Sequence, residues 1–129
     1  MNVLWIKDNN IGHEKQVQVL LDELSNNLNL NIEFRTVKGN IPFFRYIDKV
    51  QENFYDLIIG AGHKTYPILI KTKKNQKRSC KNIAVLAPSS NLMKFDVICA
   101  PSHDARRLKT ANNVIFYEGS LAKVSTDDV

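Results

Sequence analysis

Short apolar runs alternate along this chain with stretches in which apolar residues recur every three or four positions. The runs predict six strands, at residues 3–6, 32–35, 56–60, 82–87, 96–100 and 113–117. The run at 56–60 is nearly continuous in apolar residues, as is typical of a central strand buried on both faces. The helical spacing predicts helices at residues 14–28, 42–54 and 67–74. Pro42 and Pro67 fall near the expected start of the second and third helices, where proline is tolerated.

Alternating strands and helices favour right-handed crossovers and a parallel sheet covered on both faces. We therefore expect a Rossmann-like three-layer α/β/α domain with a mainly parallel sheet of about six strands. The 129 residues suit one domain, which we place at residues 1–124. Residues 125–129 are expected to form a tail or the start of an interdomain linker, and residues 102–112 could include a short helical turn.

The composition is that of a soluble globular chain, with 43% hydrophobic and 24% charged residues, and we expect a cytoplasmic location. Neither an apolar run of about 18 residues nor a signal-peptide core is present. Cys80 and Cys99 are far apart in sequence and show no metal-type spacing. We therefore expect a reducing compartment, no disulfide, no metal and no cofactor, with Cys99 buried in its strand.

The net charge of +5 is concentrated in one cluster, made of Lys71, Lys73, Lys74, Lys77, Arg78 and Lys81. The simplest interpretation is a solvated helix end, where cations also suit the helix dipole. The functional alternative is contact with an anionic membrane surface or a phosphate-bearing ligand. Nucleic acid is not expected as a partner, because no aromatic residues interleave with these charges and no nucleic-acid motif is present.

All three histidines follow predicted strands. His13, His63 and His103 come after the runs at 3–6, 56–60 and 96–100. The carboxyl ends of parallel strands share one edge of a sheet, and ligands bind in the crevice there. This placement predicts a site at that edge. A metal held by the three histidines is a weaker alternative.

The loop at 60–65, Gly-Ala-Gly-His-Lys-Thr, matches neither common nucleotide-binding motif. A dinucleotide fingerprint requires a third glycine where Thr65 stands, and a P-loop requires glycines where Ile58 and His63 stand. Two glycines still allow close approach of the backbone to a ligand, and the next helix would begin there. A tight turn without a ligand explains the loop equally well.

Ser102, His103 and Asp104 do not form a hydrolase triad. Adjacent residues cannot align as nucleophile, base and orienting group along one path. The chain also lacks the Gly-x-Ser-x-Gly turn that presents a serine nucleophile in α/β-hydrolases.

Four stretches, at residues 12–16, 56–62, 95–104 and 113–115, fall together in the order and spacing of a known family. The chain resembles the mitochondrial fission family typified by a plant factor that brings a dynamin-related protein to mitochondria. Bacterial members are often labelled nucleoside-diphosphate-sugar epimerases. The family looks like a GT-B glycosyltransferase, with two Rossmann-like halves facing a cleft, and is similar in layout to the enzyme that adds N-acetylglucosamine to a peptidoglycan lipid precursor.

In such enzymes the N-terminal half mainly binds the acceptor and the C-terminal half binds the nucleotide sugar. The resemblance implies that the N-terminal wall of the cleft is lined by Gly12, His13, Gln16, Gly60, Gly62, His63, His103 and Asp104. His13 is then the candidate general base, since imidazole commonly fills that role near neutral pH.

The chain departs from the family pattern at Lys15, where Asn is frequent, at His63-Lys64, where Arg is common, and at Ala87-Pro88-Ser89, where members have Asp-Pro-Arg. Members are also about twice the length of one such domain of roughly 150 residues, so the resemblance leads us to expect that the chain corresponds to the N-terminal half.

Two main hypotheses result. The first is the acceptor-side half of a GT-B-like glycosyltransferase, which needs a C-terminal domain or a separate half as its partner and shows no turnover alone. The second is a non-catalytic adaptor that binds a protein or an anionic membrane through the basic cluster, and so sits peripherally at a membrane. A standalone flavodoxin-like or regulator-like domain is a third and weaker hypothesis. The first strand is not followed by a clear phosphate loop, and the chain lacks the acidic pocket of a phospho-receiver domain.

Overall fold

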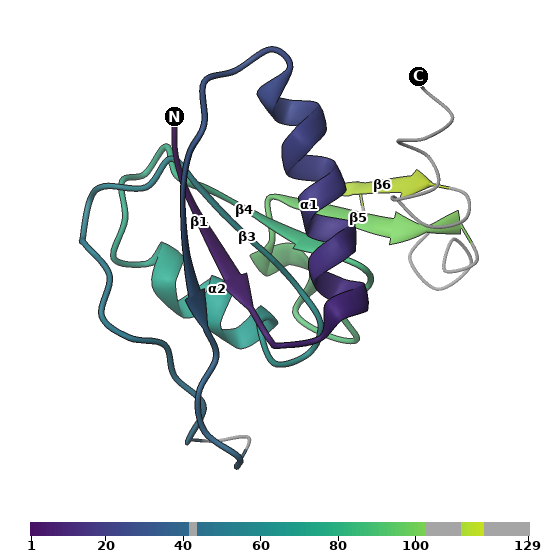
Figure 1. Ribbon diagram of the computed structural model, residues 1–129. Coiled ribbons are helices and arrows are strands. Elements are labelled where there is room, and N and C mark those ends of the chain that lie inside the picture. The colour runs from purple at the N-terminus through teal and green to yellow at the C-terminus, as the bar shows by residue number, and fades with distance from the viewer. Residues whose placement is uncertain (42–43, 103–111, 118–129) are drawn as a thin grey trace.

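Six parallel strands form one sheet in the order β2-β1-β3-β4-β5-β6 in the computed structural model, which describes residues 1–41, 44–102 and 112–117 (Figure 1). The strands are β1 (Asn2–Lys7), β2 (Asn31–Thr36), β3 (Leu57–Ala61), β4 (Lys81–Val85), β5 (Val97–Pro101) and β6 (Val114–Tyr117), with helices α1 (Ile11–Ser25) and α2 (Tyr66–Lys73) and the short 3₁₀ helix η2 (Leu92–Lys94). All six predicted strands are confirmed to within about two residues at each end, and β3 is central and fully buried. The predicted Rossmann-like α/β fold is therefore confirmed.

The strands bury side chains on both faces of the sheet, under a different helix on each face (Figure 1). Val3 and Trp5 of β1 pack with Val17 and Leu21 of α1. The alternate positions of the same strand pack into a second cluster with α2, which includes Tyr66 and Leu69. The period of two along a strand thus divides the core into two layers.

Helix α1 begins three residues earlier than predicted and also ends three residues earlier. Asn10 precedes its first turn and accepts a hydrogen bond from the His13 backbone N–H through Oδ1, at 3.1 Å. This is a standard N-cap, and it places His13 inside the first helical turn. Leu28, the last apolar residue of the predicted helix, lies beyond its end and is 43% exposed.

The helix predicted at residues 42–54 is wrong for its described part, 44–54, which is irregular. Its apolar residues Ile47, Val50 and Phe54 do pack against the α2-side core. The spacing of the apolar residues therefore indicated which side chains are buried, but not a helix. The side-chain amide of the buried residue Gln76 forms hydrogen bonds with backbone groups of this segment, in place of the hydrogen bonds that a helix would form. Its Oε1 accepts from the N–H groups of Phe54 and Tyr55, and its Nε2 donates to the Gln51 carbonyl, each at 2.9 Å.

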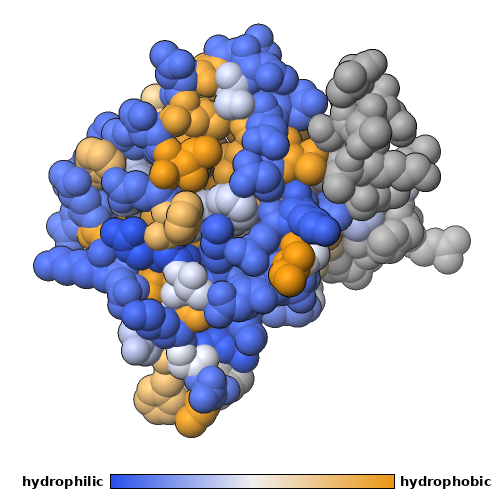
Figure 2. Space-filling model, in the orientation of Figure 1, coloured by the Kyte–Doolittle hydropathy of each residue, from blue (hydrophilic) through white to orange (hydrophobic). Residues whose placement is uncertain are grey.

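The edge strand β2 is largely uncovered. Phe34 is 56% exposed, and its ring packs edge-on against the buried Trp5 ring at 6.4 Å between centroids. The Lys7 ammonium lies over both rings, about 4 Å from each centroid. The face of the molecule in Figure 2 is mostly hydrophilic, with hydrophobic side chains gathered in patches.

The strand order has a switch point between β1 and β3. The chain leaves β1 to form β2 on one side, then returns past β1 to form β3 on the other. The connections that follow β1 and β3 diverge because α1 and α2 cover opposite faces of the sheet. In open α/β sheets this divergence leaves a crevice beyond the carboxyl ends of the strands, where ligands bind.

Candidate functional site

A carboxylate–histidine pair lies at the switch point. Asp8 follows the last residue of β1, and its Oδ2 lies 2.6 Å from Nδ1 of His13 in the first turn of α1. The Asp8 side chain is only 7% exposed, while that of His13 is 30% exposed. Asp8 Oδ1 also accepts from the Asn10 N–H at 3.1 Å, which fixes the carboxylate in the loop. The carboxylate is therefore a buried support, and the imidazole is the part that solvent reaches.

The pairing determines which imidazole nitrogen is available. An ionised carboxylate can only accept hydrogen bonds, so Nδ1 carries the proton shared with Asp8. In the neutral ring, Nε2 then holds a free lone pair. The same arrangement holds the histidine tautomer in catalytic triads and in metal-ligating histidines. His13 is thus oriented to accept a proton or a hydrogen bond through Nε2.

Gly62 closes the back of this pair from the loop after β3. A Cβ at Gly62 would lie 2.5 Å from both Asp8 Oδ2 and His13 Nδ1, which leaves no space for any side chain. Its φ of +99° is also in the left-handed region that favours glycine. Gly60 is tight as well, because a Cβ there would approach the Ile6 carbonyl and Thr65 Cβ at 3.0 Å. Both glycines thus serve the packing of β1 against the β3 loop.

The Asp8–His13 pair borders an open hollow of about 430 Å³. The lining residues are Asp8, Asn9, Asn10, His13, His63 and Lys64. The structure therefore brings His13 and His63 to one hollow, at the edge of the sheet where the sequence places them. Gly12 and Gln16 are not among its lining residues. His103 and Asp104 lie outside the described residues, so the expectation for them stays a prediction.

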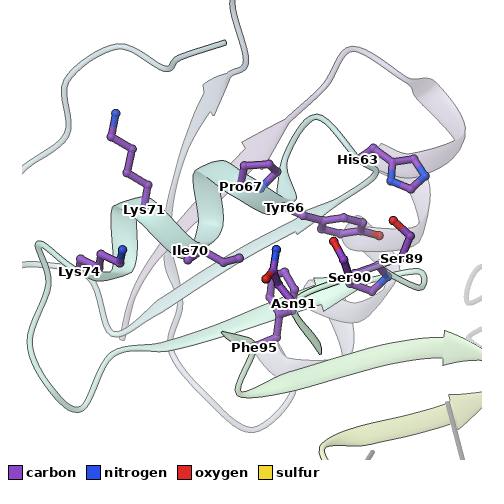
Figure 3. A pocket seen from close by; sticks show the side chains of 11 residues that line it. His63, Tyr66, Pro67, Ile70, Lys71, Lys74, Ser89, Ser90, Asn91 and Phe95 are labelled. Atoms are coloured by element: carbon purple, nitrogen blue, oxygen red, sulfur yellow. The ribbon is translucent and has the colours of Figure 1, made fainter. Parts of the chain in front are cut away.

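His63 also borders a second, larger cavity, of about 590 Å³. This cavity lies between α2 and the segment that follows β4. Figure 3 shows its lining: His63, Tyr66, Pro67, Ile70, Lys71, Lys74, Pro88, Ser89, Ser90, Asn91 and Phe95. The loop at 87–89 departs from the family pattern, yet Pro88 and Ser89 form part of this wall. His63 is where the two cavities meet.

Four of the six cations in the basic cluster fall into two sets. Lys73 Nζ lies 2.5 Å from Asp96 Oδ2, and Lys77 Nζ lies 3.6 Å from Asp56 Oδ1. These aspartates directly precede β5 and β3, at the amino ends of the strands and away from the histidines. Among the described residues, Lys71 and Lys74 have no such carboxylate partner, and both line the larger cavity. The cluster is therefore partly structural and partly free.

The two aspartates that bind these lysines titrate below their ordinary range. Burial alone would raise the pKa of Asp96, but the hydrogen bonds from Lys73 and the Asn82 N–H, with the nearby lysine charges, lower it overall. The pKa of Asp56 is lowered mainly by the hydrogen bond from the Asn2 N–H. Lys73 and Lys77 thus help to hold strand ends in place.

Asp8, the centre of the site, is not among the residues predicted from the sequence. One feature could have found it: a polar residue directly after a buried strand and five residues before a histidine. The aromatic wall of the larger cavity is not predicted from the sequence either. The rings of Tyr66 and Phe95 contact edge to face, with 5.7 Å between their centroids. The two residues are 29 positions apart in sequence, and no local pattern indicates that they meet.

Both cysteines are free thiols buried in the core, as expected for Cys99. Burial raises the pKa of each thiol to about 11. In the described part of the chain, no three His, Cys, Asp or Glu side chains group so that they could hold a metal ion. No helix in that part is long and apolar enough to cross a membrane.

Residues 11–129 match the family model described as mitochondrial fission ELM1. The match covers most of the chain, and the chain belongs to this family. No curated protein matches it. The matched region includes His13, Gly62 and His63, and begins three residues after Asp8.

Proposed function

We propose that this member of the mitochondrial fission ELM1 family is the acceptor-side half of a GT-B-like, glycosyltransferase-related protein. The carboxylate-supported His13 at the switch point is the observation that carries the proposal. Glycosyl transfer needs a base for the acceptor hydroxyl and charge stabilisation for the departing diphosphate. His13 supplies the first through Nε2, and it lines an open hollow that a sugar hydroxyl can enter.

The second requirement is not supplied by this hollow. Among the described residues that line the hollow, Lys64 is the one lysine, and it follows His63. We do not expect this single ammonium group to stabilise a departing diphosphate. In a GT-B layout the nucleotide sugar binds to the other half, across the cleft. The chain alone therefore binds an acceptor and does not turn over a nucleotide sugar. Its partner is a C-terminal nucleotide-sugar-binding domain or a separate half.

Binding of small saccharides, measured by isothermal calorimetry with wild-type chain and two variants, tests this function. We expect weak binding that His13→Gln removes and that Lys15→Gln, an exposed change on α1, leaves intact. Release of nucleoside diphosphate from UDP-, GDP- and dTDP-sugars should stay at background. Saccharide binding unaffected by His13→Gln, or turnover by the chain alone, would contradict the proposal.

The second candidate function is an adaptor on an anionic membrane or protein. A hollow of about 450 Å³ favours it, because it gathers Lys74, Arg78 and Lys94 beside Met93, which is 73% exposed. Lys73 and Lys77 are unsuitable test positions, since reversing their charge would also break their pairs with Asp96 and Asp56. We expect Arg78→Gln with Lys94→Gln to weaken sedimentation with phosphatidylserine vesicles if this function holds. Lys15→Gln with Lys49→Gln removes equal charge elsewhere and is the control.

A further inference from the structure

The chemical character of the larger cavity along α2 changes from one end to the other. His63, Ser89 and Ser90 gather at one end, and Lys71 and Lys74 lie at the other, farther along the helix (Figure 3). Between them the wall is apolar and rigid. Tyr66 is held there by the hydrogen bond from its hydroxyl to the Val85 carbonyl, at 2.7 Å.

Lys71 and Lys74 leave the same face of the helix, although their side chains point in different directions in Figure 3, so a shared anion requires rotation of these exposed, flexible side chains. Residues three apart on a helix lie on the same face, with about 5–6 Å between their Cβ atoms. Neither lysine has a carboxylate partner within the described part of the chain, in contrast to Lys73 and Lys77. Two ammonium groups match the two negative charges of a phosphate monoester better than the single charge of a carboxylate.

The surroundings strengthen the positive potential on the Lys74 side, whereas Lys71 also lines a neighbouring hollow that contains Asp48 and Glu52. The hollow on the Lys74 side shares Ile70 and Lys74 with the cavity and adds the cations of Arg78 and Lys94. No carboxylate of the described residues lines the cavity or the hollow on the Lys74 side. An anion entering from that side meets several cations and no acidic side chain in the lining.

The apolar middle of the cavity favours an organic ligand over an inorganic ion, because an ion alone would leave the apolar wall without a contact. Pro67 and Ile70 of α2 line the cavity together with Phe95, which is itself only 3% exposed. The volume of about 590 Å³ is in the usual range for a small organic ligand. We propose that this cavity binds an organic phosphate monoester, with its phosphate at Lys71 and Lys74 and its apolar body against Tyr66, Ile70 and Phe95.

This site is separate from the proposed acceptor site and shares only His63 with it. The inference does not require glycosyl transfer, so its test must distinguish the two sites. His13→Gln should leave phosphate-ester binding unchanged, whereas it removes saccharide binding. The two proposals can therefore fail independently.

Calorimetry with four probes tests the site. Octyl phosphate and uridine monophosphate represent a lipid-type and a nucleotide-type source of the same chemistry. Inorganic phosphate supplies the anion alone, and octyl glucoside supplies an apolar chain with a neutral head. We expect octyl phosphate or uridine monophosphate to bind more tightly than both inorganic phosphate and octyl glucoside. The ester that binds more tightly shows whether the natural ligand is of the lipid type or the nucleotide type. Equal binding of inorganic phosphate, or no binding of either ester, would overturn the proposal.

Variants separate charge from shape. Lys71→Gln with Lys74→Gln should weaken ester binding by about tenfold or more, because two charge-assisted contacts are lost. Lys15→Gln with Lys49→Gln removes equal charge outside the cavity and should leave the affinity unchanged. Ser90→Trp keeps the charge, fills the cavity from an exposed position and should block binding. Thermal unfolding of each variant confirms that it is folded, and ester affinity unchanged in the lysine pair would overturn the assignment.

Discussion

Gly62 leaves no room for a side chain against His13: a Cβ at Gly62 would lie 2.5 Å from the imidazole Nδ1. The two residues come from different loops, after β3 and at the start of α1, and meet only because β1 and β3 are neighbours in the sheet. Adjacent strands at the switch point thus assemble the histidine, its carboxylate and the glycine behind them.

Gly62→Ala should destabilise the protein and displace the Asp8–His13 pair. The left-handed φ alone costs about 1–3 kcal/mol for a residue with a Cβ, and the close approach adds to it. Chemical denaturation measures the loss. Gly12→Ala is the comparison and should cost less, because it lies in a helix, where alanine is favoured, and its Cβ would meet only the N-cap oxygen of Asn10, at 3.3 Å, which a small shift of that side chain relieves. Equal stability of the two variants would contradict the tight packing at Gly62.

Asp8→Asn should change the tautomer of His13. An amide can donate to Nδ1, so the ring proton is expected to move to Nε2, which loses its lone pair. The ¹⁵N shifts of the ring nitrogens report this exchange directly. Asp22→Asn, on the exposed part of α1 where the carboxylate only accepts from Gln18, is the control and should leave the His13 signals unchanged. Identical ring spectra for wild type and Asp8→Asn would show that the carboxylate does not set the tautomer.

Stability should fall in acid through the Lys73–Asp96 pair. The pKa of Asp96 is lowered in the folded protein, so the unfolded chain binds more protons between that value and its own pKa near 3.9. The free energy of unfolding therefore rises with pH in this interval. The contribution is complete above about pH 5 and is lost as the pH falls through the lowered pKa. Urea melts between pH 7 and pH 2.5 measure it.

Lys73→Met is the informative variant in this experiment. Without the ammonium group, the pKa of Asp96 is raised by burial with less compensation, and the acid-side slope should become shallower. An unchanged slope would show that Lys73 does not stabilise the ionised carboxylate. Lys74→Met, a neighbouring lysine without a carboxylate partner in the described chain, should keep the wild-type slope.

Gln76→Leu should destabilise the protein strongly although its volume hardly changes. The amide oxygen accepts from two backbone N–H groups, and Leu would leave the buried one, that of Tyr55, without a partner. An unsatisfied buried donor costs about 1–3 kcal/mol, so a loss of about 2–4 kcal/mol is expected. Gln18→Leu on exposed α1 should change stability by less than about 0.5 kcal/mol. Similar melting for both variants would refute this role of Gln76.

The buried thiols should resist alkylation. Because burial raises the pKa of Cys80 and Cys99 to about 11, very little thiolate is present at pH 8. Iodoacetamide followed by mass spectrometry should show no modification of the native protein and two additions in 6 M urea. Rapid labelling under native conditions would contradict the burial of these side chains.

The strands were predictable because each is a short apolar run ended by polar or turn residues. The helical spacing at residues 47–54 was misleading, since burial of every third or fourth residue also suits an irregular segment whose backbone is bound by a distant side chain. Gln76 makes those hydrogen bonds from 22 positions away from Phe54, and no local pattern reports such a partner.

The candidate site was predictable in place but not in chemistry. Strand ends located His13 and His63, because topology alone brings them to one edge. Asp8 and the free state of Lys71 depend on side-chain directions and pairings that spacing does not reveal. The basic cluster seemed uniform in sequence, yet folding pairs Lys73 and Lys77 with aspartates and leaves Lys71 and Lys74 in a cavity.

The most direct test of the account is the ¹⁵N spectrum of the His13 ring during a titration with small saccharides. We predict that Nε2 shifts as a hydroxyl donates to it, while Nδ1, bound to Asp8, moves little. A spectrum unchanged at saturating saccharide would contradict the proposal that His13 receives an acceptor hydroxyl, and binding of the same sample to anionic vesicles would then favour the adaptor.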